Sequence, residues 1–299
     1  MRRHIIVLAL AAGAAGAGLT AHWVVSDAPA RRSGVTAGAT EAITAKPGAA
    51  AAKDLTRPFD RSALTQAVRA YLSTRPGKAG VMATDLRTGL TFGENEKGRF
   101  VTASIMKVDI LSSLVLQRQR HHRALTRGQR ELAGRMIRES DNNAADALYS
   151  AAGGSGGVKK ANKSFGLKST TPFPGSWGSS LTTPADQVRL LSNLVSAKSP
   201  VNAPGRAYIL DLMGSVQREQ AWGVSAAARP GEKVALKNGW TPVHHQGNGW
   251  AVNSVGRVTG RDHDFLIAVC SGDSPTMGAG VATVEHVAEM VVSTLRDSR

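Results

Sequence analysis

Three short motifs hold the residues of this sequence whose types and spacing could carry out chemistry. The first is TASIMKV, residues 102–108, where Ser104 precedes Lys107 by three positions at the start of an apolar run. Residues three apart share one face of a helix, so a neutral Lys107 amine could take the proton of the Ser104 hydroxyl. Taken alone, the pair fits a helix cap followed by a surface lysine better than it fits a catalytic pair.

Two further motifs change the interpretation of that pair. Ser140-Asp141-Asn142 ends an expected helix and offers a hydroxyl for proton transfer and an amide for a substrate carbonyl. Lys237-Asn238-Gly239 lies on an expected strand and supplies a second ammonium group, with a glycine that a substrate backbone can approach. Each motif is weak by itself, but together they provide what an acylating serine needs.

The order S-x-x-K, S-D-N, K-x-G resembles that of the serine β-lactamase and penicillin-binding protein superfamily, and most closely the class A β-lactamases. The resemblance covers residues 57–299. It implies an exported serine hydrolase that forms a Ser acyl-enzyme with β-lactam or D-Ala-D-Ala-like amide or ester substrates. It implies no cofactor and no metal ion.

The resemblance assigns four catalytic residues. Ser104 would be the acylated nucleophile and Lys107 its general base. Ser140 would pass a proton to the leaving nitrogen. Lys237 would lower nearby pKa values and attract a substrate carboxylate.

Four further residues are implied in substrate binding. Asn142 would hold the substrate amide, and Asn238 stands where the family has a hydroxyl that helps to bind a carboxylate. Gly239 would admit the substrate backbone. The backbone N–H groups of Ser104 and Trp240 would form the oxyanion hole.

The sequence departs from the class A pattern in the loop before T-T-P. Class A enzymes carry a Glu there that activates the deacylating water, but residues 162–184 contain no Asp or Glu. Without a base, water should attack the acyl-enzyme slowly. Asp186, just beyond the loop, is a weak substitute candidate. Arg257 could point toward or away from the site, and His244 and His245 fit a solvated turn.

The order of expected elements predicts an α+β fold. Periodicity and capping signals indicate helices over 63–72, 105–116, 127–140, from Pro184 and over 281–297, and strands over 80–86, 90–96, 233–240, 249–258 and 262–270. GGSGG, residues 153–157, is expected to be a flexible turn. These elements fit a class A β-lactamase-like fold: an antiparallel five-stranded sheet flanked by the terminal helices, with an all-helical insertion and a cleft between sheet and insertion.

The first 56 residues are predicted to lie outside the folded domain. Residues 1–30 combine a basic start with a long apolar run, which is typical of a signal peptide or an uncleaved membrane anchor. Residues 31–56 are rich in Ala, Gly and Thr and are predicted to be a disordered tether. The hydrolase domain, 57–299, is therefore expected to be secreted or extracytoplasmic, with the membrane involved only through that anchor.

Charge and cysteine content restrict the partners. The net charge of +15 favours polyanions, but no long Lys/Arg run or aromatic-interleaved basic stretch indicates nucleic-acid binding. The expected partners are a small-molecule or peptidoglycan-type substrate and an anionic cell wall. The single cysteine, Cys270, is expected to be buried. An alternative function remains: a non-catalytic peptidoglycan-binding protein on the same fold.

Overall fold

The computed structural model describes residues 58–243 and 249–298, and these contain a five-stranded sheet with strand order β2-β1-β7-β6-β5. Every neighbouring pair in it is antiparallel. The strands are β1 (Lys78–Asp85), β2 (Thr91–Glu94), β5 (Lys233–Val243), β6 (Gly249–Thr259) and β7 (Asp264–Ser274), while β3 (Phe100–Val101) pairs with β4 (Leu181–Thr182) separately. The predicted signal segment and tether, His244 and His245 lie outside the described residues.

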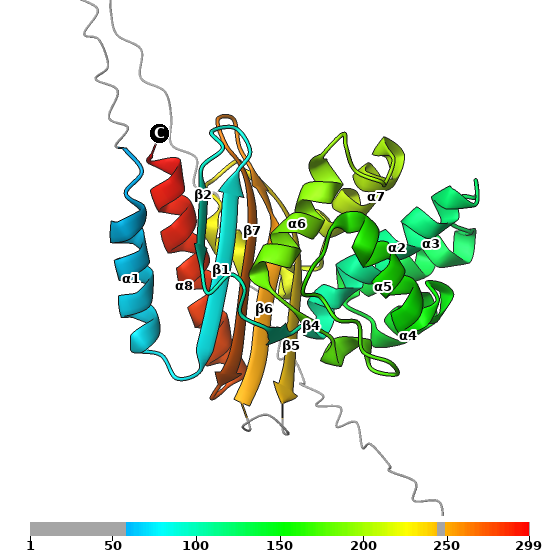
Figure 1. The fold of residues 1–299 in the computed structure, drawn as a ribbon, viewed down its shortest axis with the longest axis horizontal. Helices are drawn as coiled ribbons and strands as arrows, with labels where there is room; N and C mark the ends of the chain where they lie inside the picture. Colours follow the sequence, from blue (N-terminus) through cyan, green and yellow to red (C-terminus); the bar gives the residue numbers. More distant parts are fainter. Residues whose placement is uncertain (1–57, 244–248, 299) are drawn as a thin grey trace, which may run out of the picture. The chain divides into compact units, whose positions relative to one another are not determined.

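Helices cover both faces of the sheet (Figure 1). On one face lie α1 (Arg61–Ser73) and α8 (Met277–Arg296). On the other lie α2 (Met106–Arg120), α3 (Arg127–Gly134), α4 (Asn142–Ala151), α5 (Gly154–Phe165), α6 (Pro184–Val195) and α7 (Ala203–Met213). The predicted α+β, class A β-lactamase-like arrangement is thus confirmed.

The terminal helices form where the sequence predicts them. The Asp60 side chain accepts a hydrogen bond from the backbone N–H of Ala63 and caps α1. On α8 the predicted apolar face, Val284, Val287, Val291 and Leu295, is buried against the sheet. None of the helices within the described ranges is long and apolar enough to cross a bilayer.

The helix α2 is the centre of the helical block. Every residue from Met106 to Leu116 is buried, including Lys107 and Asp109. A helix that is apolar on nearly every side must be surrounded, and α2 contacts α4, α5 and α7. The interpretation of 105–116 as a buried helix is therefore confirmed, and α2 can hold the end of Lys107 away from water.

The expectation of a flexible turn at residues 153–157 is wrong. Gly153 and Gly154 have left-handed φ of 83° and 59°, and α5 begins at Gly154 with Gly153 as its N-cap. Glycine has low intrinsic helix propensity, but tertiary packing overrides it here. A Cβ on Gly157 would lie 1.8 Å from the carbonyl oxygen of Ala152, so the glycine permits close packing within the block.

The remaining local signals are confirmed. Thr126 and Gln129 form the expected capping box at α3, and Thr183 caps α6. Cys270 is buried on β7, where burial raises the pKa of its thiol. The sequence interpretation omitted α4, α7 and the short β3–β4 pair. That pair supports the turn before Ser104.

Candidate active site

Ser104 lies in a tight turn between β3 and α2. Residues Ala103–Ile105 form a short 3-10 turn, and Ala103 has a left-handed φ of 46°. The backbone N–H of Thr102 donates to the carbonyl of Ser180, which fixes the start of this turn. Ser104 itself is partly exposed, while its neighbours Ala103 and Ile105 are buried. The turn therefore presents the Ser104 hydroxyl at a surface.

Lys107 contacts the two serines of the predicted site. Its Nζ lies 2.9 Å from Ser104 Oγ and 3.0 Å from Ser140 Oγ, and it also donates to the Ser140 carbonyl at 2.6 Å and to Asn142 Oδ1 at 2.8 Å. The side chain is fully buried. Burial lowers the pKa of Lys107 to about 8, although Asp141 and Asp146 partly oppose the shift. An appreciable fraction of neutral amine is therefore available near neutral pH.

Ser140 is positioned by an irregular helix end. After α3 the chain makes a π-helical turn, Arg135–Glu139, and Ser140 then adopts a left-handed conformation with φ of 60°. Such a conformation costs a non-glycine residue free energy and is often found at functional sites. The next residue, Asp141, caps α4 by accepting from the N–H of Ala144. The result is that Ser140 Oγ lies between two lysines.

Lys237 is the second of these lysines. From β5 its Nζ reaches Ser140 Oγ at 3.0 Å and the carbonyl of Asn238 at 2.9 Å. Burial, followed by repulsion from Lys107, lowers the pKa of Lys237 to about 7. The polar chain Ser104–Lys107–Ser140–Lys237 is therefore continuous, and both of its amines can lose a proton near neutral pH.

Strand β5 packs directly against the turn that holds Ser104. A Cβ on Gly239 would lie 2.6 Å from the backbone nitrogen of Ser104 and 2.7 Å from that of Ile105. Only glycine permits this approach. Trp240 follows and is half-buried, with its ring 5.7 Å from that of Trp222. The approach brings the backbone of Trp240 near that of Ser104, as the predicted oxyanion hole requires.

Asn238 does not face the site in the way the sequence suggested. Its side chain is fully buried, and its amide donates to the carbonyls of Gln220 at 2.7 Å and Trp222 at 2.9 Å. Successive side chains of a strand point to opposite faces, so with Lys237 directed at Ser140, Asn238 is directed away. A role for this amide in holding a substrate carboxylate is therefore corrected to a structural one.

A cleft of about 640 Å³ opens beside Ser104. Residues from β5, from α4 and from the 173–181 loop line it together with Ser104, as expected for a cleft between sheet and helical block. The lining includes Asn142 and Trp240, which the sequence predicted. It also includes Asp146 and Trp177, which the sequence did not.

Trp177 lies in the loop before T-T-P, residues 162–184, which contains no acid. Its ring centroid lies 4.8 Å from Lys107 Nζ, and its indole N–H donates to Asp146 Oδ1 at 2.6 Å. An apolar ring thus covers the amine of Lys107 on the loop side. A lone Trp in a polar loop gave no signal of this position, since it depends on how the loop packs on α4.

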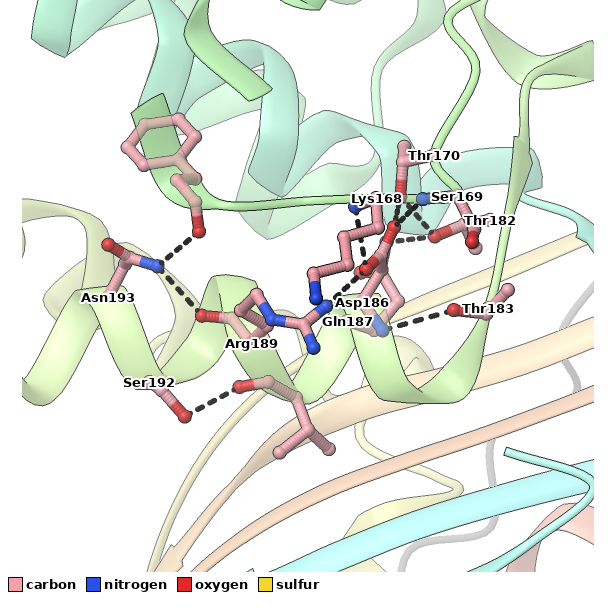
Figure 2. A network of polar contacts seen from close by, with 12 residues as sticks. Lys168, Ser169, Thr170, Thr182, Thr183, Asp186, Gln187, Arg189, Ser192 and Asn193 are labelled. Carbon is pink, nitrogen blue, oxygen red and sulfur yellow. Dashed lines mark hydrogen bonds and ion pairs between the residues drawn. The ribbon is translucent and has the colours of Figure 1, made fainter. Parts of the chain in front are cut away.

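Asp186 secures the base of that loop and is not a substitute for the missing acid (Figure 2). Its carboxylate is 1% exposed and accepts from the N–H groups of Lys168 and Ser169 and from the Thr170 hydroxyl, at 3.1, 2.7 and 2.9 Å. Arg189 pairs with it at 2.5 Å. Every oxygen is committed, and Asp186 does not line the cleft.

Asn253, on β6, is a positioning residue that the sequence did not reveal. Its amide donates to the carbonyls of Val101 and Thr102 at 2.9 and 3.1 Å, and its oxygen accepts from the N–H of Ser271 at 3.2 Å. It therefore ties the turn before Ser104 to the sheet. Arg257, on the same strand, is committed to Asp264 through contacts of 2.6 and 2.7 Å.

No candidate metal centre accompanies these residues. Within 58–243 and 249–298, no three or more His, Cys, Asp or Glu side chains group closely enough to hold an ion. The groups that the cleft region offers are hydroxyls, amines, backbone N–H groups and the carboxylate of Asp146.

Comparison with known proteins supplies a family. The family described as "Beta-lactamase enzyme family" matches residues 63–128 and 112–295. Among solved structures, the TLA-1 extended spectrum β-lactamase has a TM-score of 0.71 at 18% identity, covering 79% of this chain and 99% of that one. A class A β-lactamase from Mycobacterium abscessus has a TM-score of 0.66 at 21% identity, covering 78% and 99%. At these identities the likeness shows the fold.

Two further comparisons concern proteins with other names. PBP-A has a TM-score of 0.68 at 20% identity, covering 81% of this chain and 99% of that one, and a mutant of it is described as an acyl-enzyme complex with penicillin G. A curated relative in Mycobacterium tuberculosis, named "Putative lipoprotein LppW", is 26% identical over 196 residues, which is 63% of this chain and 61% of the relative. The match thus spans about three fifths of that relative's length.

Proposed function

This chain belongs to the beta-lactamase enzyme family, and from that premise we propose that it is a serine hydrolase with Ser104 as nucleophile. Its substrates are β-lactams or D-Ala-D-Ala-like amides and esters. It forms an acyl-enzyme with them and releases the acyl group slowly.

The polar chain from Ser104 to Lys237 is the observation that carries this proposal. Neutral Lys107, 2.9 Å from Ser104 Oγ, accepts the hydroxyl proton as Oγ attacks the carbonyl carbon. Ser140, within 3.0 Å of both lysines, gives its proton to the leaving nitrogen and is reprotonated by a lysine. Backbone N–H groups of Ser104 and Trp240 stabilise the oxyanion. A buried pair of amines costs stability, and proton transfer is a reason for keeping it.

Slow deacylation follows from the loop beside the site. Residues 162–184 contain no carboxylate, and Asp186 is committed to the loop's own backbone. The ring of Trp177 lies over Lys107 on that side. Water at the acyl-enzyme therefore has no loop carboxylate to activate it.

An extracytoplasmic location fits both the sequence and the relative. The basic start and long apolar run of residues 1–30 are typical of export, and the relative in Mycobacterium tuberculosis is named as a lipoprotein. A thiol-linked lipid is not carried over to this chain, because its single cysteine, Cys270, is buried in β7.

A non-catalytic wall-binding protein is the second candidate. The committed amide of Asn238 and the loop without an acid favour it, since both weaken a standard hydrolytic site. The intact contacts among Ser104, Lys107 and Ser140 favour an enzyme, because binding alone does not require them.

A time course with a fluorescent penicillin separates the two candidates. The purified protein is incubated with the compound and its intact mass is followed beside Ser104→Ala and the control Ser73→Ala, an exposed serine on α1. We expect one covalent adduct in the wild type and in Ser73→Ala, and none in Ser104→Ala. If the wild type is not labelled, or if Ser104→Ala still forms an adduct, then Ser104 is not the nucleophile.

A further inference from the structure

The cleft beside Ser104 has an unusual charge for this protein. The chain carries a net charge of +15, yet Asp146 is the single charged side chain among the described residues that line the cleft. Asp146 is exposed and lies on α4 one turn after Asn142, whose amide oxygen contacts Lys107. The entrance to the site is therefore acidic within a basic molecule.

One aromatic side chain, Trp177, contacts that carboxylate, and a second, Phe173, lines the same cleft. The Trp177 indole donates to Asp146 Oδ1 at 2.6 Å and so fixes the orientation of the carboxylate. Tyr149, three residues on from Asp146, donates to the carbonyl of Phe173 at 2.8 Å, which brings this loop residue over the same helix. The Phe173 ring is 49% exposed and lines the cleft. A carboxylate beside exposed aromatic faces attracts cations.

The positively charged side chains near the cleft are not available to bind a substrate carboxylate beside Asp146. Lys107 and Lys237 are fully buried and bonded to Ser140, and the pKa of each is lowered by burial. Arg257 is paired with Asp264. In the described part of the chain, the cleft entrance thus offers a negative charge and no free positive one.

We propose that the preferred substrate carries an ammonium group on its acyl side chain, and that this group binds Asp146 beside Phe173 while Ser104 attacks the carbonyl. This inference rests on the proposed function, since it names the substrate class of the same site. The proposal therefore predicts that the cleft prefers substrates with a cationic acyl side chain over substrates with an anionic one.

A matched pair of penicillins tests the inference. One carries a 6-aminohexanoyl and the other a heptanoyl side chain, so that the two differ only in a terminal ammonium or methyl group. Second-order acylation rates are measured by intact mass for the wild type, Asp146→Asn and the charge-matched control Asp262→Asn, an exposed turn residue. We expect the wild type and the control to prefer the ammonium compound by about fivefold, and Asp146→Asn to show a ratio near one.

A second measurement keeps this result separate from the proposed function. Equilibrium binding of the same pair to Ser104→Ala is measured by calorimetry, with and without Asp146→Asn. If no acylation occurs but the ammonium compound binds tighter through Asp146, the proposed hydrolase fails, while the recognition of an ammonium group by Asp146 stands. Equal binding of the two compounds, or a preference that survives Asp146→Asn, overturns the inference whether or not Ser104 is acylated.

Discussion

At the scale of single residues, the site depends on two lysines that the fold keeps out of water. Burial disfavours the charged form, so the pKa of Lys107 falls to about 8 and that of Lys237 to about 7. The same burial holds both amines against Ser140. The activation of Ser104 that we propose would therefore follow from where α2 and β5 lie in the core.

Acylation should accelerate with pH because the base must be neutral. Protonated Lys107 cannot accept the Ser104 proton, so the rate should rise about tenfold per unit up to about pH 8 and then level off. The measurement is the rate of penicillin acylation between pH 6 and 10. Lys107→Arg, which keeps its proton, should be inactive throughout, whereas Lys159→Arg on the exposed face of α5 should follow the wild type. A flat profile would contradict the role of Lys107.

Asn253 should affect both stability and chemistry. Asn253→Ala removes the partner of the Val101 and Thr102 carbonyls, just before Ser104, and of the Ser271 N–H on β7. We therefore expect a loss of about 2 kcal/mol in the free energy of unfolding. Because the turn loses its tie to β6, acylation should also fall about tenfold per folded molecule. Asn193→Ala removes similar bonds, to the carbonyls of Phe165 and Arg189, and should lower stability only. Equal effects of the two variants on acylation would show that Asn253 has no positioning role.

At the scale of elements, the loop between α5 and α6 determines what surrounds Lys107. Asp186 fastens residues 168–170 to α6 (Figure 2). Trp177 is held by Asp146 on α4. The loop is thus bound at its base and near its middle. The loop contains no acid between residues 162 and 184, and the ring of Trp177 lies over Lys107.

Loss of the hydrogen bonds between Asp186 and residues 168–170 should make the loop between α5 and α6 more mobile. Asp186→Ala orphans two backbone N–H groups and Arg189, so we expect a loss of about 3 kcal/mol in unfolding free energy and faster hydrogen exchange over 168–181. Asp211→Ala removes a carboxylate that is 75% exposed and pairs with Arg138 at 3.7 Å, and should change stability by less than about 1 kcal/mol. Unchanged exchange in Asp186→Ala would contradict the fastening role.

Sequence signals that depend on neighbouring residues predicted the helix starts well, but they did not predict how the loop between α5 and α6 is arranged. The cap at Asp60, the capping box at Thr126 and the cap at Thr183 each depend on a few neighbouring residues, so they could be predicted from the sequence. The start of α5 at Gly154 could not, because the close approach of Gly157 to the carbonyl of Ala152 is a property of the packed fold. The positions of Trp177 and Asn253 depend on partners far along the chain, and the orientation of Asn238 depends on the strand register.

At the scale of the whole molecule, the site lies where the sheet meets the helical block. Lys237 and Gly239 come from β5, Ser104 from the turn before α2, Lys107 from α2 itself, and Ser140 from the junction between α3 and α4. Figure 1 shows these elements. Motif order along the chain indicated the residues that meet, and the fold brings them within hydrogen-bonding distance. The molecule surrounding this site is strongly basic.

The positive charge should retain the protein on an anionic cell wall. Attraction between exposed charges is screened as salt rises, with a Debye length of about 8 Å at 0.15 M and about 3 Å at 1 M. We expect most of the protein bound to isolated anionic walls to be released between about 0.05 and about 0.5 M NaCl. Uncharged dextran beads serve as the control and should retain none. Retention that does not change with salt would contradict an electrostatic association.

We propose that Ser104 is acylated and that the acyl-enzyme is hydrolysed slowly. The lifetime of a preformed adduct is the most direct measurement of this. The wild-type protein is labelled with a fluorescent penicillin, separated from free compound, and followed by intact mass and peptide mapping. Because no loop carboxylate activates water, we expect a single adduct on the peptide that contains Ser104. This adduct should persist for hours. An adduct on another residue, or one that disappears within seconds, would contradict it.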